Sequence, residues 1–134
     1  MTDFKKILIA NRGEIAIRIM RAARDLEIPS VAVYSSDDAA SLHIRRADES
    51  LALPGTSVRG YLDIAAAVKS GCDAVHPGYG FLAENSEFAQ RCEAEGLIFV
   101  GPSVEALELF GDKTRARSLA VDQGVPVLTG SAGP

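Results

Sequence analysis

The sequence predicts an α/β fold, a Rossmann-like open parallel sheet of about five strands flanked by helices. Short runs such as residues 6–10 and 31–34 are too apolar for half-exposed strands, which favours central parallel strands. These runs alternate with stretches whose apolar residues recur at the helical period. Such alternation is typical of βαβ units with right-handed crossovers.

The elements follow in order along the chain. The expected strands are residues 6–10, 31–34, 50–53, 74–76 and 97–100. The expected helices are residues 14–26, 39–47, 61–69, 84–95, 104–110 and 113–121. Ser103 and Asp112 precede the last two helices, and their side chains are good N-terminal caps. No strand follows the last helix, so we expect a domain over residues 1–112 and a helix and linker over residues 113–134.

The first helix has two distinct faces. One is expected to be buried, and its residues are Ile15, Ile19, Ala22, Ala23 and Leu26. The opposite face has two oppositely charged pairs at a spacing of four residues, Glu14 with Arg18 and Arg21 with Asp25. This polar face is either solvated or forms a contact between two copies of the chain.

Composition narrows the class of protein. The chain has 134 residues, of which 47% are apolar, and a net charge of -4. It therefore suits one domain with a sizeable core, and a nucleic-acid partner is not expected. No apolar run approaches the roughly 20 residues of a membrane span. Two cysteines, Cys72 and Cys92, and the lack of a targeting pattern favour a reducing compartment, so we expect a cytoplasmic protein.

The stretch of residues 76–85 is the most informative motif. Gly78 and Gly80 flank Tyr79 directly after an expected strand, which indicates a sharp turn that something can approach closely. Open α/β sheets bind their ligands at turns of this kind. Glu84, at the expected start of a helix, can bond the amides of the turn.

Other motifs are weaker. The turn at residues 11–13 has a single glycine, so a nicotinamide or flavin cofactor is not expected there. Lys113, in the first turn of a helix, can hold phosphate. His76 has no nucleophile or paired carboxylate near it in sequence, and dispersed carboxylates predict no metal site. A charged cluster is expected at the surface; its members are His43, Arg45, Arg46, Asp48 and Glu49.

Together these segments resemble the N-terminus of biotin carboxylases, the family of the biotin carboxylase subunits or domains of acetyl-CoA, propionyl-CoA and pyruvate carboxylases. The matching segments, in order, are residues 6–16, 31–35, 47–49, 76–85, 99–102 and 111–113. The resemblance extends from Lys6 to Pro134. Only residues 61–73 depart from the pattern, since they look about one helical turn shorter.

The resemblance implies an enzyme that uses Mg-ATP and bicarbonate to make a carboxyphosphate and then carboxylates a ureido nitrogen of biotin. It implies that Lys113 contacts ATP phosphate and that Tyr79 and Gly80 lie beside the biotin ring, with Glu84 supporting their turn. It also implies a homodimer whose interface lies near three residues of the first helix, Arg18, Arg21 and Asp25.

The same resemblance implies that the functional site is shared with other parts. The family's second ATP lysine, glycine-rich lid, metal ligands and catalytic arginine would lie beyond residue 134, in the missing ATP-grasp domain. We therefore expect no catalytic residue and no metal ligand in this chain, no tightly bound ATP, Mg²⁺ or biotin, and no activity of the chain alone. The expected partners are that ATP-grasp part, a biotin carboxyl carrier and a carboxyltransferase; no membrane partner is expected.

Two alternatives stay open at this stage. One is the leading domain of another ATP-grasp ligase, such as a carbamoyl-phosphate synthase. The other is a non-catalytic dimerisation module that uses the polar face of the first helix. The acceptor that is finally carboxylated is not encoded in this segment.

Overall fold

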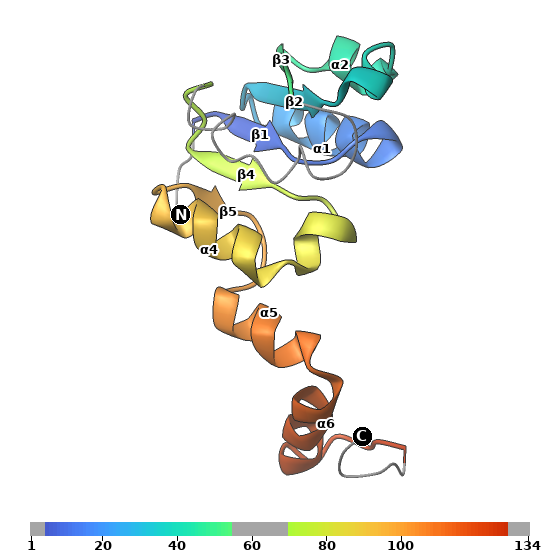
Figure 1. Ribbon diagram of the computed structural model, residues 1–134, viewed down its shortest axis with the longest axis vertical. Coiled ribbons are helices and arrows are strands. Elements are labelled where there is room, and N and C mark those ends of the chain that lie inside the picture. Colours follow the sequence, from blue (N-terminus) through green and yellow to red (C-terminus); the bar gives the residue numbers. More distant parts are fainter. Residues whose placement is uncertain (1–4, 55–69, 129–134) are drawn as a thin grey trace.

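The computed structural model describes residues 5–54 and 70–128 and has the expected α/β fold (Figure 1). Its strands are β1 Ile7–Ile9, β2 Ser30–Tyr34, β3 Glu49–Ala52, β4 Ala74–His76 and β5 Ile98–Phe99. Its α-helices are α1 Gly13–Asp25, α2 Leu42–Arg46, α4 Ser86–Ala94, α5 Val104–Gly111 and α6 Lys113–Asp122. Two 3₁₀ helices, η1 Ser36–Asp38 and η3 Phe81–Glu84, complete the described elements. The helix expected over residues 61–69 lies outside the described residues.

The sheet has the order β3-β2-β1-β4-β5, and all neighbouring strands are parallel. β1 is central, because Leu8 lies opposite Val31 of β2 on one side and Val75 of β4 on the other. All three residues of β1 are buried. The prediction of a central parallel strand near residues 6–10 is thus confirmed.

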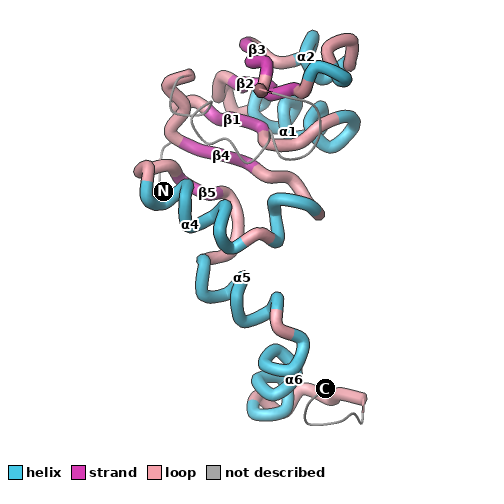
Figure 2. The backbone as a smooth tube through the Cα atoms, in the orientation of Figure 1, coloured by secondary structure: helices cyan, strands magenta, loops and turns pink. Residues whose placement is uncertain are grey.

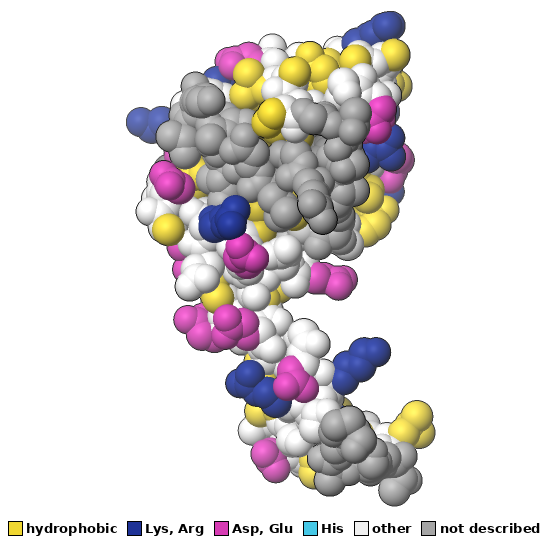
Figure 3. All heavy atoms as spheres, in the orientation of Figure 1, with side chains coloured by type: hydrophobic (Ala, Val, Ile, Leu, Met, Phe, Trp, Pro, Cys, Tyr) yellow, Lys and Arg dark blue, Asp and Glu magenta, His cyan; other side chains and the backbone are white. Residues whose placement is uncertain are grey.

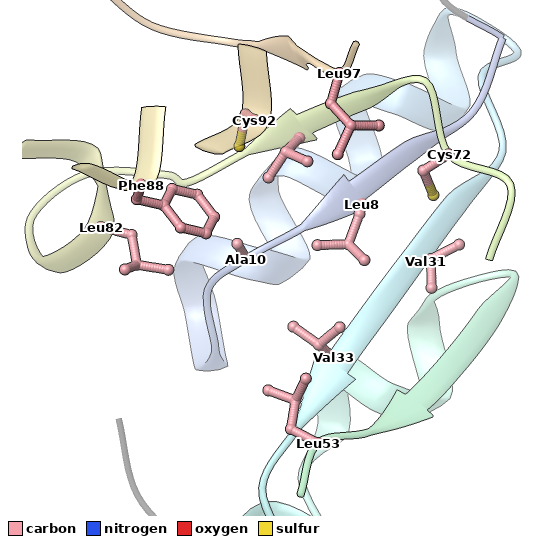
Figure 4. Close-up of a cluster of buried hydrophobic side chains, with 11 residues drawn as sticks. Leu8, Ala10, Val31, Val33, Leu53, Cys72, Leu82, Phe88, Cys92 and Leu97 are labelled. Atoms are coloured by element: carbon pink, nitrogen blue, oxygen red, sulfur yellow. The ribbon is translucent and has the colours of Figure 1, made fainter. Parts of the chain in front are cut away.

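Helices cover both faces of the sheet, and alternating side chains of β1 contact them. On one face, Ile9 packs with Ala16 and Met20 of α1. On the other face, Leu8 belongs to a larger cluster that includes Phe88 and Cys92 of α4 (Figure 4). This two-sided core holds the carboxyl ends of the strands in fixed positions.

The C-terminal helices form an arm that leads away from the sheet (Figure 2). Neither α5 nor α6 has a buried residue, and the side chains of Phe110 and Leu128 are 63% and 90% exposed. Figure 3 shows acidic and basic side chains interspersed on this side of the arm. The arm has no core of its own within the described residues.

Several element boundaries differ from the prediction. The helix expected over residues 39–47 is shorter, since only α2 at Leu42–Arg46 forms there, and the 3₁₀ helix η1 lies just before the expected range. The helix expected to start at Glu84 starts at Ser86, because Asn85 caps it by accepting a hydrogen bond from the Phe88 N–H at 2.8 Å. The caps Ser103 and Asp112 are confirmed, since both accept hydrogen bonds from first-turn amides.

The buried face of α1 was predicted incorrectly in part. The buried residues are Ala16, Met20 and Ala23, whereas Leu26 is 70% exposed. The true stripe is offset by one residue, about 100° around the helix, because the helix axis lies over β1 and β2.

The expected exposure of His43 was also wrong, because its side chain was predicted to lie at the surface and is fully buried. Its Nε2 lies 3.3 Å from the Val33 carbonyl oxygen, and its Nδ1 has no hydrogen-bond partner among the described residues. Burial lowers the pKa of this imidazole, so the neutral form is favoured.

Candidate functional site

The order of the strands defines a topological switch point between β1 and β4. From β1 the chain proceeds to β2 and β3 on one side, and it then returns to β4 on the other side. Ligands of open α/β sheets bind outside the carboxyl ends of the strands at such a point. The segments that flank it here are residues 11–13 after β1 and residues 77–80 after β4, which we call the glycine turn.

Asn11 joins the two sides of the switch point. Its Nδ2 donates hydrogen bonds to the Pro77 carbonyl at 2.8 Å and to the Tyr79 carbonyl at 3.5 Å. Its Oδ1 accepts a hydrogen bond from the Arg12 N–H at 2.8 Å. These contacts determine the orientation of the amide, which is only 8% exposed. Sequence reasoning missed this role, because nothing in a single asparagine marks a partner 66 residues away.

Gly78 is fixed by conformation and by space. Its φ is +73°, and a Cβ there would lie 2.5 Å from Asn11 Nδ2 and 2.8 Å from Ile15 Cγ2. Its N–H donates to His76 Nδ1 at 3.0 Å, so His76 has a structural role in the turn. Burial lowers the pKa of His76, which favours the neutral imidazole that can accept this bond.

The outer part of the turn is open. The side chain of Tyr79 is 61% exposed. Gly80 has a φ of +63°, and no atom lies within 4 Å of the position that a Cβ would take. A flat ligand could therefore reach the backbone at Gly80 and the ring of Tyr79. The Glu84 carboxylate makes no hydrogen bond with the described residues, so its support of the turn stays a prediction.

A second polar network lies beside the turn after β1. The Arg12 guanidinium donates to both carboxylate oxygens of Asp38, and the hydroxyl of Ser41 donates to Asp38 at 3.1 Å. The hydrogen bond from Arg12 lowers the pKa of Asp38. This network connects the carboxyl end of β1 to η1, and no local pattern in the sequence indicates it.

Lys113 lies on the C-terminal arm, away from the sheet that carries the glycine turn. It begins α6, which is separated from the sheet by α5 (Figure 1). The Asp112 carboxylate accepts hydrogen bonds from the amides of Thr114 and Arg115 at 2.9 and 3.1 Å. Because these first-turn amides are occupied, any phosphate here would depend on the Lys113 ammonium. The described residues do not bring Lys113 and Tyr79 together.

The polar face of α1 is exposed at Arg18, Arg21 and Asp25. Arg18 donates to Glu14 at 2.6 Å, as its spacing predicts, whereas the described residues contain no Arg21–Asp25 ion pair. Arg18 and Arg21 also line a groove of about 430 Å³ between α1 and α2. Their role in an interface stays a prediction.

Other kinds of site are not found in the part of the chain that the structure describes. Residues 5–54 and 70–128 contain no group of three side chains that could hold a metal ion. No helix in these ranges is long and apolar enough to cross a bilayer. Cys72 and Cys92 are free and buried, and burial raises the pKa of Cys92 to about 11, so its thiolate is disfavoured.

The fold defines a class: an α/β domain with an open parallel sheet, whose candidate site lies at the switch point. Residues 3–107 match the model of the biotin carboxylase N-terminal domain. The chain belongs to the biotin carboxylase family, of which it has the N-terminal domain.

Individual relatives agree with this assignment. The chain is 50% identical to pyruvate carboxylase of Staphylococcus aureus, over 100% of this chain and 12% of the relative. It is 49% identical to biotin carboxylase of Pseudomonas aeruginosa, over 97% of this chain and 30% of the relative. The chain thus spans less than a third of these relatives.

A solved structure has the same fold. It is the biotin carboxylase domain dimer of Hydrogenobacter thermophilus 2-oxoglutarate carboxylase in complex with MgADP, ADP and bicarbonate. The match has a TM-score of 0.94 and 42% identity, and it covers 99% of this chain and 30% of that chain.

Proposed function

We propose that this chain is the leading part of a biotin carboxylase that uses bicarbonate and Mg-ATP to carboxylate carrier-bound biotin. The observation that supports this most strongly is the glycine turn at the switch point, with Tyr79 exposed and open space at Gly80. In the related Hydrogenobacter domain, MgADP and bicarbonate are bound. We also propose that the domain ends at residue 112, directly before α6 begins at Lys113.

Each proposed site residue has a limited task. Tyr79 offers a ring face and Gly80 an unobstructed backbone to the ureido ring of biotin, and Glu84 supports their turn. Lys113 would neutralise charge on ATP phosphate. Transfer of a phosphoryl group depends mainly on positioning and charge neutralisation, and Mg²⁺ supplies the larger share of the positive charge when it is bound.

The remaining groups come from a partner. We propose that the ATP-grasp part of the enzyme supplies the metal ligands, the second lysine and the catalytic arginine, so that this chain alone is inactive. A biotin carboxyl carrier and a carboxyltransferase complete the overall reaction. We propose that the enzyme is located in the cytoplasm. We call this chain together with the ATP-grasp part the complete enzyme.

Two substitutions in the complete enzyme test these roles separately. Tyr79→Ala is expected to raise the KM for free biotin about tenfold with little change in the KM for ATP, since one ring contact is lost. Lys113→Gln is expected to raise the KM for ATP instead, by a similar factor of about ten. Arg115→Gln, a neighbouring cation on α6, is the control. Equal effects of Tyr79→Ala and Lys113→Gln on both substrates would contradict the assignment.

A further inference from the structure

We propose that Asn11 is a positioning residue for the biotin ring. Its buried amide holds the backbone of the glycine turn, and therefore Tyr79 and Gly80, in the geometry that the ligand requires. This inference rests on the proposed function, because it names the residue that fixes the biotin side of that site.

The position of the Tyr79 ring depends on the backbone that carries it. Its side chain is 61% exposed, and no hydrogen bond from the described residues holds its hydroxyl. Packing of the ring cannot fix its position at such exposure. The ring is placed by the backbone of residues 77–80, so whatever fixes that backbone also fixes the surface that a ligand meets.

The sheet and Asn11 together hold the backbone of the glycine turn. The sheet aligns the two segments, since the Ala10 N–H donates to the His76 carbonyl at 2.9 Å. Beyond that point, Asn11 Nδ2 bridges the Pro77 and Tyr79 carbonyls. Two carbonyl oxygens that face one amide would repel each other without the donor between them.

Gly78 fits closely against the Asn11 amide and Ile15. The Asn11 amide and Ile15 occupy the space where a side chain at position 78 would lie, since a Cβ there would be 2.5 Å from Asn11 Nδ2. The amide is also held at its other end by the Arg12 N–H. These contacts therefore fix the orientation of the Asn11 amide and the position of the turn backbone against it.

Substitution of Asn11 in the complete enzyme tests the inference. In Asn11→Asp, a carboxylate would face the Pro77 and Tyr79 carbonyls, and in Asn11→Ala the donor is absent. Either variant is expected to lower kcat/KM for free biotin by about tenfold or more, because a buried hydrogen bond is lost. The KM for ATP in bicarbonate-dependent ATP cleavage is expected to stay within about twofold.

A matched variant separates positioning from general destabilisation. Asn85→Ala removes another side-chain hydrogen bond to backbone, the cap of α4, and leaves the contacts of Asn11 intact. Thermal unfolding is measured for each variant. If Asn11→Ala and Asn85→Ala lower the biotin and ATP parameters together, in proportion to lost stability, Asn11 is merely structural and the inference is wrong.

The same assay distinguishes the two levels of the proposal. If the unsubstituted complete enzyme shows no biotin-dependent ATP cleavage, the proposed function fails, and with it the ligand assigned to the turn. If that enzyme responds to biotin but the Asn11 variants lack the selective loss, only the role of Asn11 fails.

Discussion

At the scale of single residues, the site depends on backbone positions that short side-chain contacts hold. Gly78 and Gly80 could be recognised from the sequence, because two glycines around a tyrosine indicate an open turn. Asn11 and the Arg12–Asp38 network could not, since their partners are distant along the chain and no local pattern marks them. The glycine turn was thus predictable from the sequence, whereas the side chains that hold it in place were not.

Replacement of Gly78 by alanine tests the close contact with Asn11. Gly71 has a similar φ of +69° but open space around its Cβ position, so Gly71→Ala measures the conformational cost alone. That cost is roughly 1–2 kcal/mol for a left-handed residue. Gly78→Ala is expected to lower the free energy of unfolding by about 1–3 kcal/mol more, because of overpacking. Equal losses in urea unfolding would show that the turn does not press on Asn11.

The buried histidines predict how stability depends on pH. Burial lowers the pKa of both His43 and His76, so the unfolded chain binds protons at a higher pH than the folded chain. The free energy of unfolding is therefore expected to fall as pH decreases below about 6.5, towards the lower pKa values of the folded state. Urea unfolding between about pH 5 and pH 8 measures this.

A variant assigns part of that pH dependence. His76→Asn keeps an oxygen near the position of Nδ1 that can accept the Gly78 N–H and removes the titrating group, so a weaker dependence on pH is expected. Stability that is constant or that rises as pH falls through this range would contradict the account of both histidines.

At the scale of elements, hydrophobic periodicity predicted which elements form better than where they end. Five strands and the caps Ser103 and Asp112 agree with the described structure. The start of α4 differed from the expected Glu84 because Asn85 supplies the cap. The buried stripe of α1 was misplaced since a helix with apolar residues on adjacent stripes does not reveal which one faces the sheet.

The exposed face of α1 predicts an interface between two copies. Arg18, Arg21 and Asp25 project from one helix with no core role, and the Hydrogenobacter domain is described as a dimer. Arg21→Glu reverses a charge on this face and is expected to shift the complete enzyme from dimer to monomer in light scattering. Arg91→Glu, on α4, is the control. A dimer that persists in Arg21→Glu, or a monomer before substitution, would rule out this use of α1.

At the scale of the whole molecule, the described residues contain the glycine turn, which is one side of the proposed site, and the arm formed by α5 and α6. The sheet presents the glycine turn, while the exposed apolar residues of α5 and α6 have no core within the described residues. Lys113, on that arm, is not brought to Tyr79 by the contacts described. The remaining groups, namely the metal ligands, a second lysine and the catalytic arginine, are expected from the proposed ATP-grasp part, so the chain alone is expected to be inactive.

The most direct measurement is ATP cleavage by this chain alone and by the complete enzyme, each with and without bicarbonate and free biotin. The account predicts that the complete enzyme cleaves Mg-ATP in a bicarbonate-dependent reaction that biotin stimulates, and that the chain alone does not. Biotin-dependent cleavage by the chain alone would contradict the shared site. A complete enzyme that ignores biotin and instead requires an amine donor would contradict the function itself.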